Sequence, residues 1–151
     1  MPSRDTPPLV RIALAGFLAW IVPGLGHIYL GHRRRGLVFL VTISATFWSG
    51  VAIGGVRGTV DPVSRRAWFM AELFNGGNTL AGLGFHRMLA ASDNPHDPPP
   101  HPGHWLAVEV GIHYAGVAGL LNLLVILDVI VRADPTARRR TVVDAVPQEG
   151  P

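Results

Sequence analysis

The 151-residue sequence contains no cysteine and no lysine, and only 15% of its residues are charged. The absence of cysteine excludes disulfides, thiolate metal sites and cysteine nucleophiles. All thirteen basic residues are arginines, and they lie in short clusters beside apolar runs. Such clusters are typical of topology determinants and of contacts with lipid headgroups. Because no motif or aromatic-interleaved basic patch supports nucleic-acid binding, we expect no nucleic-acid partner.

Hydrophobic residues make up 48% of the chain and are concentrated in long runs. A helix rises about 1.5 Å per residue, so about 20 apolar residues cross the roughly 30 Å hydrocarbon layer of a membrane. The sequence lacks the alternating pattern of a barrel strand. Since only helices and closed barrels satisfy their backbone in lipid, the sequence predicts an all-α integral membrane protein that contacts the lipid bilayer.

After a short N-terminal tail (1–8), residues 9–56 predict a transmembrane hairpin with spans at about 10–30 and 36–56 and a hinge at 31–35. The triplet Arg33-Arg34-Arg35 lies between the two apolar runs, where a soluble fold has no use for it. The alternative is a signal peptide with residues 12–22 as its apolar region. We favour an uncleaved helix because apolarity resumes at Ile28.

Several hinge residues constrain the first span. Pro23 removes a backbone donor and predicts a kink. Gly24 and Gly26 allow a neighbouring backbone to approach closely, and Gly31 begins the turn. His27 and Tyr29 could form an acid/base pair, but we favour a hydrogen bond between them that fixes the hinge. In the second span, Gly50 and Gly54 form a small-xxx-small pair that either mediates helix contact or reflects ordinary membrane composition.

Residues 57–104 predict a polar loop, an amphipathic helix lying in the membrane interface, and a proline- and histidine-rich tether. Phe69, Met70 and Phe74 share a helical face with Leu73, and Glu72 and Asn75 lie away from it. The pattern is interrupted at 75–78 and resumes over 80–91. The alternative is a fourth span over 67–91, which we disfavour because burying a charge near the bilayer centre costs about 2.5–3.5 kcal/mol.

Residues 105–132 predict a third transmembrane helix, followed by a flexible tail (133–151). Three spans place the two termini on opposite sides of the membrane. If the hinge and the C-terminal tail are cytoplasmic, seven arginines lie on that side and six on the other. This bias favours an external N-terminus with a cytoplasmic hinge and tail.

The tether contains His96, His101 and His104, with Asp97 beside the first. Neutral imidazoles bind zinc, copper or nickel, so these histidines are candidate metal ligands. Their spacing matches no established ligand motif, and proline removes backbone donors that usually orient such ligands. We therefore favour a plain polar tether, and expect no cofactor.

The third helix carries polar residues inside its apolar run. Glu109 and His113 are four residues apart and share one face, which suits either a proton relay or a structural polar contact between helices. We favour the structural contact because Glu109 lies about one turn from the helix start. Asp128 is a further polar residue of this span.

A stripe of small residues follows the same helix at spacings of three and four and ends in an amide. It consists of Gly111, Ala115, Ala118, Gly119 and Asn122. Such stripes allow close helix packing. We expect this small-residue stripe to pack against Pro23 to Gly26 of the first span, although self-association would use the same surface.

Ala19 to Gly31, with Arg35-Gly36 after it, resembles the hairpin of the widespread two-transmembrane-segment domain, in which a Gly-x-His, a Tyr-Leu-Gly and a later Gly join two helices. The chain has one residue fewer between His27 and Tyr29 and lacks the Arg that usually follows the His. Nearly the whole chain is similar to an uncharacterised family of small multi-pass membrane proteins from planctomycete-type bacteria. Its recurrent blocks are matched by Phe47–Gly55, Val60–Pro62, Trp68–Phe69, Ala118–Leu124 and Asp128.

This resemblance implies a helical fold and a place in the bacterial inner membrane, but no activity. The sequence has no nucleophile motif, phosphate-binding loop or carboxylate pair of catalytic spacing, so we do not expect an enzyme. The leading hypothesis is a structural scaffold or accessory subunit that acts through transmembrane helix packing, by self-association or with another membrane protein. The alternative is a metal-binding or transport accessory protein that uses the histidine-rich tether.

Overall fold

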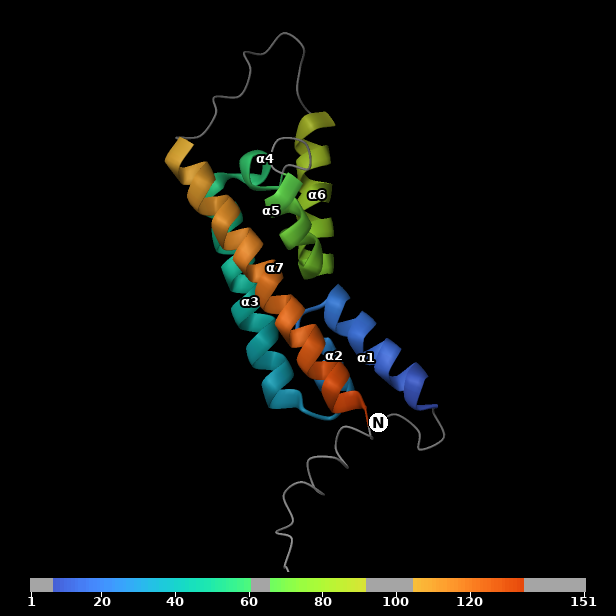
Figure 1. The fold of residues 1–151 in the computed structure, drawn as a ribbon. Coiled ribbons are helices and arrows are strands. Elements are labelled where there is room, and N and C mark those ends of the chain that lie inside the picture. Colours follow the sequence, from blue (N-terminus) through green and yellow to red (C-terminus); the bar gives the residue numbers. More distant parts are fainter. Residues whose placement is uncertain (1–6, 61–65, 92–104, 135–151) are drawn as a thin grey trace, which may run out of the picture.

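A computed structural model describes residues 7–60, 66–91 and 105–134, and all regular structure in these ranges is helical. The expected all-α fold is therefore confirmed for this part of the chain (Figure 1). The elements are α1 (Pro8–Ile21), α2 (Leu25–Tyr29), α3 (Arg33–Gly54), α4 (Val56–Thr59), α5 (Arg66–Glu72), the 3-10 turn η1 (Leu73–Asn75), α6 (Gly76–Ala91) and α7 (Trp105–Ala133).

Helices α3 and α7 form the central antiparallel pair (Figure 1). They approach closely because glycines face each other: a Cβ atom on Gly50 would lie 2.6 Å from the carbonyl oxygen of Gly111, and one on Gly111 would lie 2.8 Å from the Cα of Gly54. The small-xxx-small pair of α3 is thus a helix contact. Within the described ranges, α3 and α7 are the two helices long and apolar enough to cross a membrane.

The first apolar run does not form one kinked span, so that prediction is wrong. Helix α1 ends at Ile21, and the chain reverses through Pro23 and Gly24 into α2. Gly24 has a φ of +81°, which an L side chain rarely adopts, and a Cβ there would collide with the Gly36 backbone. Gly26 then lies against Ala15 and Ala19 of α1. The two segments therefore form a short antiparallel hairpin.

Residues 66–91 form a second hairpin that enters from the opposite end of the molecule (Figure 1). Helix α5 packs along α7, since Gly116 faces the ring of Trp68 and Gly119 faces the backbone of Ala71. Beyond η1 the chain turns back into α6, and the Leu89 carbonyl near the end of α6 accepts a 2.8 Å hydrogen bond from Arg57 of α4. The tip of this hairpin, at η1, lies near the middle of the molecule (Figure 1).

The polar residues of the second hairpin face inward, which differs from the expected interfacial helix. The side chains of Glu72 and Asn75 are 1% and 0% exposed, whereas those of Met70 and Phe74 are 61% and 39% exposed. Met70 and Phe74 lie on the outward side, as the pattern predicts, but Phe69 of the same predicted face packs on the core. An interfacial helix would turn its polar face toward water, whereas the fold turns Glu72 and Asn75 toward α7 and the molecular interior.

The two hairpin tips meet, so that α1 and α6 lie end to end (Figure 1). Cβ atoms on Gly76 and Gly77 would collide with the carbonyl oxygens of Trp20 and Ile21. The C-terminal end of α1 thus faces the N-terminal end of α6, an arrangement that the opposite partial charges of the two helix ends favour. Together these helices form a two-piece column, in which α1 packs on α7 and α6 packs on α3 and α4.

Both ends of the described chain lie at one end of the molecule, together with Gly31 and the start of α3 (Figure 1). Ile12 and Leu30 pack with Ala133 and Ile130 in one apolar cluster there. Three spans would place the ends of residues 7–134 at opposite ends of the molecule, whereas here they lie at the same end. The physical reason is the reversal at Pro23 and Gly24, which returns the chain to the end from which it entered.

Candidate functional site

The junction between the two hairpins is built around Asn122 of α7, which is fully buried. Its Nδ2 donates hydrogen bonds to the carbonyl oxygen of Ala19 in α1 (3.1 Å) and to that of Phe74 in η1 (2.8 Å). The indole nitrogen of Trp20 donates to the carbonyl oxygen of Leu73 (2.9 Å). These bonds reach carbonyls at the ends of helical segments, where intrahelical donors run out; the Leu73 carbonyl also accepts from the backbone N–H of Gly76.

A second set of hydrogen bonds ties the junction to α3. The Nδ2 of Asn78 lies 3.1 Å from the hydroxyl of Ser44 and 3.1 Å from Oδ1 of Asn75, and donates to both. The indole nitrogen of Trp48 donates to Oδ1 of Asn78 (3.2 Å). Asn78 thus links the start of α6 to η1 and to α3, which is about thirty residues away in sequence. An apolar side chain there would leave Trp48 without this acceptor.

Three buried polar atoms of the junction residues have no hydrogen-bond partner among the described residues: Oε2 of Glu72, Nδ2 of Asn75 and Oδ1 of Asn122. The Thr79 hydroxyl donates to the backbone carbonyl of Glu72, not to its carboxyl group. Leaving a buried polar group unsatisfied costs about 1–3 kcal/mol. Stability alone therefore does not explain why these residue types occupy the junction.

A second polar centre joins α2 to α7 near the end of the molecule. The buried His27 donates from Nε2 to Oδ2 of Asp128 (2.8 Å), and Arg132 donates from Nε to the same oxygen (2.7 Å). The ring of His27 also lies 5.1 Å from that of Phe39 on α3. The expected bond to Tyr29 is therefore replaced by one to Asp128, and Tyr29 packs in the apolar cluster beside α1.

The pair Glu109 and His113 does not join through its side chains in a relay. The Nδ1 of His113 lies 2.6 Å from the backbone carbonyl oxygen of Glu109, to which it donates. The His113 ring lies 4.6 Å from that of Trp68 on α5. This places His113 in a contact between α5 and α7, and the structural role of the pair stays a prediction.

The small-residue stripe of α7 is buried along its whole length. It packs on three elements in turn and not on the hinge. Gly111 faces α3, Gly119 faces the backbone of α5, and Asn122 reaches α1 at Ala19. Gly26 of the hinge lies instead against Ala15, Ala19 and Val129. The stripe is therefore occupied within one molecule.

The candidate metal ligands His96, His101 and His104 lie outside the described residues, as does Asp97. Within residues 7–60, 66–91 and 105–134, no group of three or more His, Asp or Glu side chains is arranged to hold a metal ion. The binding capacity of the tether therefore stays a prediction.

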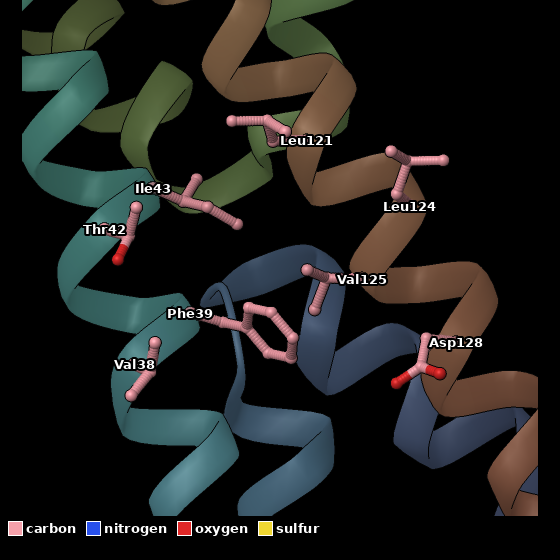
Figure 2. A pocket seen from close by; sticks show the side chains of 8 residues that line it. All are labelled: Val38, Phe39, Thr42, Ile43, Leu121, Leu124, Val125 and Asp128. Carbon is pink, nitrogen blue, oxygen red and sulfur yellow. The ribbon is translucent and has the colours of Figure 1, made fainter.

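An apolar groove of about 390 Å³ runs between α3 and α7 (Figure 2). It is lined by Val38, Phe39, Thr42, Ile43, Leu121, Leu124, Val125 and Asp128. Asp128 lies at one end of the groove, away from Leu121 (Figure 2). A basic cavity of about 470 Å³ lies at the end of the molecule where α3 begins and α7 ends. It is lined by Gly31, His32, Arg33, Arg34, Arg35 and Arg132.

Sequence reasoning missed Trp20, Ser44, Trp48, Glu72 and Asn78 as parts of the junction. The available signal was the run Asn75-Gly76-Gly77-Asn78, which was interpreted only as a helix interruption. Two amides around two glycines also suit a tight backbone junction that is held by side-chain bonds. The partners of that junction are too distant in sequence for any local pattern to identify.

The described ranges define an all-helical protein with two long apolar helices, two opposed hairpins and a polar junction between their tips. The chain belongs to the family of unknown function DUF6677, which it matches over residues 14–141. This confirms the expectation of a family without an assigned activity. No curated protein and no solved structure matches the chain.

Proposed function

We propose that this chain is a multi-pass protein of the bacterial inner membrane. Helices α3 and α7 cross the bilayer, and the two hairpins enter it from opposite faces. The observation that carries the proposal is an inverted distribution of polarity. Glu72, Asn75, Thr79 and Asn122 are buried, whereas large apolar side chains such as Leu124 (62% exposed) cover the outside. Lipid is the surrounding in which this distribution is favourable.

The burial of the two long helices supports the same proposal. Only 28% of the most apolar stretch of α3 and 39% of that of α7 are buried within the protein. A core helix of a soluble protein would be mostly buried. The two-piece column of α1 and α6 resembles the broken helices that other membrane proteins keep where their ends are covered by protein.

The arginines support a cytoplasmic location for the end that holds both ends of the described chain. Five arginines of the described ranges lie toward that end (Arg11, Arg33, Arg34, Arg35, Arg132) and three toward the other (Arg57, Arg66, Arg87). The three consecutive ones occupy a short connection, where the positive-inside bias is strongest.

Single cysteines test this topology, because the natural chain has none. Leu9→Cys, Arg34→Cys, Arg66→Cys and Ala91→Cys all lie at exposed positions. With a membrane-impermeant maleimide, we expect Leu9→Cys and Arg34→Cys to react from the cytoplasmic side and the other two from the opposite side. Phe17→Cys, on the outer face of α1, serves as the lipid-facing control and is expected to be protected.

The topology experiment separates two arrangements. Reaction of Leu9→Cys and Arg34→Cys from opposite sides would establish a conventional first span and contradict the hairpin. Reaction of all five variants in the soluble fraction would contradict membrane insertion itself.

Within the membrane, the proposed role is that of a structural scaffold or accessory subunit. Two features support it. The polar side chains at the junction hold elements of the same chain together, and the outward face of α7 is apolar and carries Val117, Leu120, Leu127 and Val131. Because the small-residue stripe is already occupied, a partner helix would use this outward face.

Native mass spectrometry of protein extracted gently from its own membrane, without added metal, tests the role. A metal-free dimer or a complex with a second membrane protein is expected. A monomer under all mild extraction conditions would contradict the scaffold. Bound transition metal that disappears when His96, His101 and His104 are changed to alanine would instead support the metal-binding alternative.

A further inference from the structure

The cavity at the start of α3 concentrates positive charge. Arg33, Arg34 and Arg35 are exposed and line it together with Arg132 of α7. Arg132 is paired with Asp128, but within the described ranges no residue forms an ion pair with any of the three α3 arginines. The cavity therefore has the charge that an anionic ligand requires, and arginine is the side chain best suited to bind phosphate oxygens.

The position of these arginines is unfavourable without an anion. Helix α3 begins at Arg33, and no side chain caps its first turn. The N-terminal end of a helix carries a partial positive charge and prefers an anion nearby. Here three cations lie in the first turn of a 22-residue helix. A bound anion would offset both the helix end and the side-chain charges.

The basic cavity and the apolar groove between α3 and α7 adjoin at the pair Asp128 and Arg132. Arg34 and Val38 are four residues apart on one face of α3, and Asp128 and Arg132 are four apart on α7. Asp128 lines the groove, Arg132 lines the cavity, and the two side chains are 2.7 Å apart. Both helices thus change from basic to apolar in the same direction.

The groove walls are left uncovered by the rest of the chain. Val38 on α3 and Leu124 on α7 are 61% and 62% exposed, and they lie on opposite sides of the groove (Figure 2). A volume of about 390 Å³ lies within the range of about 300–1,000 Å³ typical of small-molecule sites. The ligand that matches both cavities has a negative head and a long apolar tail.

We propose that the protein binds an anionic phospholipid, with its phosphate on Arg33, Arg34 and Arg35 and one acyl chain in the groove between α3 and α7. This inference rests on the proposed membrane location. Free phosphate would leave the groove unused, and a neutral phospholipid would leave the arginine charges unbalanced. Basic pockets at the cytoplasmic ends of membrane helices are suited to such headgroups.

The test uses the full-length protein in vesicles of equal parts phosphatidylcholine and phosphatidylglycerol. After extraction in a mild detergent, native mass spectrometry counts the phospholipid molecules that remain bound. We expect phosphatidylglycerol to be retained over phosphatidylcholine by about fivefold or more, since each arginine near the surface attracts anionic lipid.

Two test pairs of substitutions, each with a control pair, separate the contribution of the arginines to lipid binding from that of the groove. Arg33→Gln with Arg34→Gln removes two charges from the cavity, and Arg66→Gln with Arg87→Gln removes two exposed charges from the opposite end. Val38→Trp with Leu124→Trp fills the groove, and Leu80→Trp with Leu106→Trp adds the same bulk to exposed positions away from it. Both test pairs are expected to lose phosphatidylglycerol retention by about fivefold, and both control pairs to keep it.

Equal retention of the two lipids by the natural protein would overturn the inference, as would full retention in either test pair. If inorganic phosphate displaces the lipid while the groove-filling pair has no effect, the cavity binds phosphate alone, and the inference is again overturned. Each of these results leaves the membrane proposal intact. Recovery of the protein outside the vesicles would contradict the proposed membrane location instead.

Discussion

The two hairpins have the same architecture but very different compositions. The α1–α2 hairpin is apolar apart from Arg11 and His27, whereas the α5–α6 hairpin carries Glu72, Asn75 and Asn78 near its tip. They start at opposite ends of the molecule, and each turns near its middle and runs back (Figure 1). The comparison shows that two segments of different hydropathy form the same kind of reversal. Both turns contain glycines that lie against other backbone segments, Gly24 against Gly36 and Gly76 against Trp20.

The largest expected effect comes from blocking the meeting of the two tips. Gly76→Val would place its Cβ in the Trp20 backbone. We therefore expect the free energy of unfolding in mild detergent to fall by at least about 3 kcal/mol relative to the natural protein. Gly84→Val is the control on the same helix, because nothing lies within 4 Å of a Cβ there. Equal thermal stability of the two variants would contradict the end-to-end column.

An intermediate effect is expected when Asn122 is replaced by leucine. The substitution removes the hydrogen bonds to Ala19 and Phe74, one for each hairpin. Hydrogen bonds within membranes contribute about 0.6 kcal/mol each and up to about 1.7, so the loss is expected at about 1–3 kcal/mol. Equilibrium unfolding in detergent measures it. If stability does not fall, Asn122 does not join the hairpins.

The hydrogen bond that attaches the first hairpin to α7 is tested by a double-mutant cycle between His27→Ala and Asp128→Asn. The 2.8 Å hydrogen bond between these residues holds α2 on α7. We expect a coupling free energy of about 0.5–1.5 kcal/mol. The pair Tyr29→Phe and Asp128→Asn is the control and should be additive. A coupling near zero for His27 would show that the hairpin is held by apolar packing alone.

The smallest effect on stability is expected from Glu72→Gln. The residue is buried, and its Oε2 has no partner among the described residues. An amide of the same shape removes a group that is costly to bury when ionised, so stability should change by less than about 0.5 kcal/mol or rise. A clear loss in equilibrium unfolding would mean that the carboxyl group has an essential partner.

The sequence predicts the helical class, the two long helices and several contact residues. Gly50 and Gly54 contact α7 as a small-xxx-small pair should, and the stripe from Gly111 to Asn122 is buried. These features depend on spacing along one helix. They can therefore be predicted from periodicity.

The reversals could not be predicted in this way. Gly24 has a left-handed conformation and leaves no room for a Cβ, since the Gly36 backbone lies against it. Trp20 is hydrogen-bonded to Leu73, which is 53 residues away. Such contacts arise only when separate segments assemble. The inward direction of Glu72 and Asn75 has the same origin, because it depends on α7, which follows them in the chain.

The two-piece column has a consequence for biosynthesis. Helix α1 has 14 residues and reaches about 21 Å, too short to cross the hydrocarbon layer alone, and its continuation α6 is made more than fifty residues later. The carbonyls at the end of α1 therefore reach their final contacts only after Asn122 and α6 have been synthesised. Helix α1 is therefore made before the segments that cover its end and reaches its final surroundings only after α6 and α7 have been made.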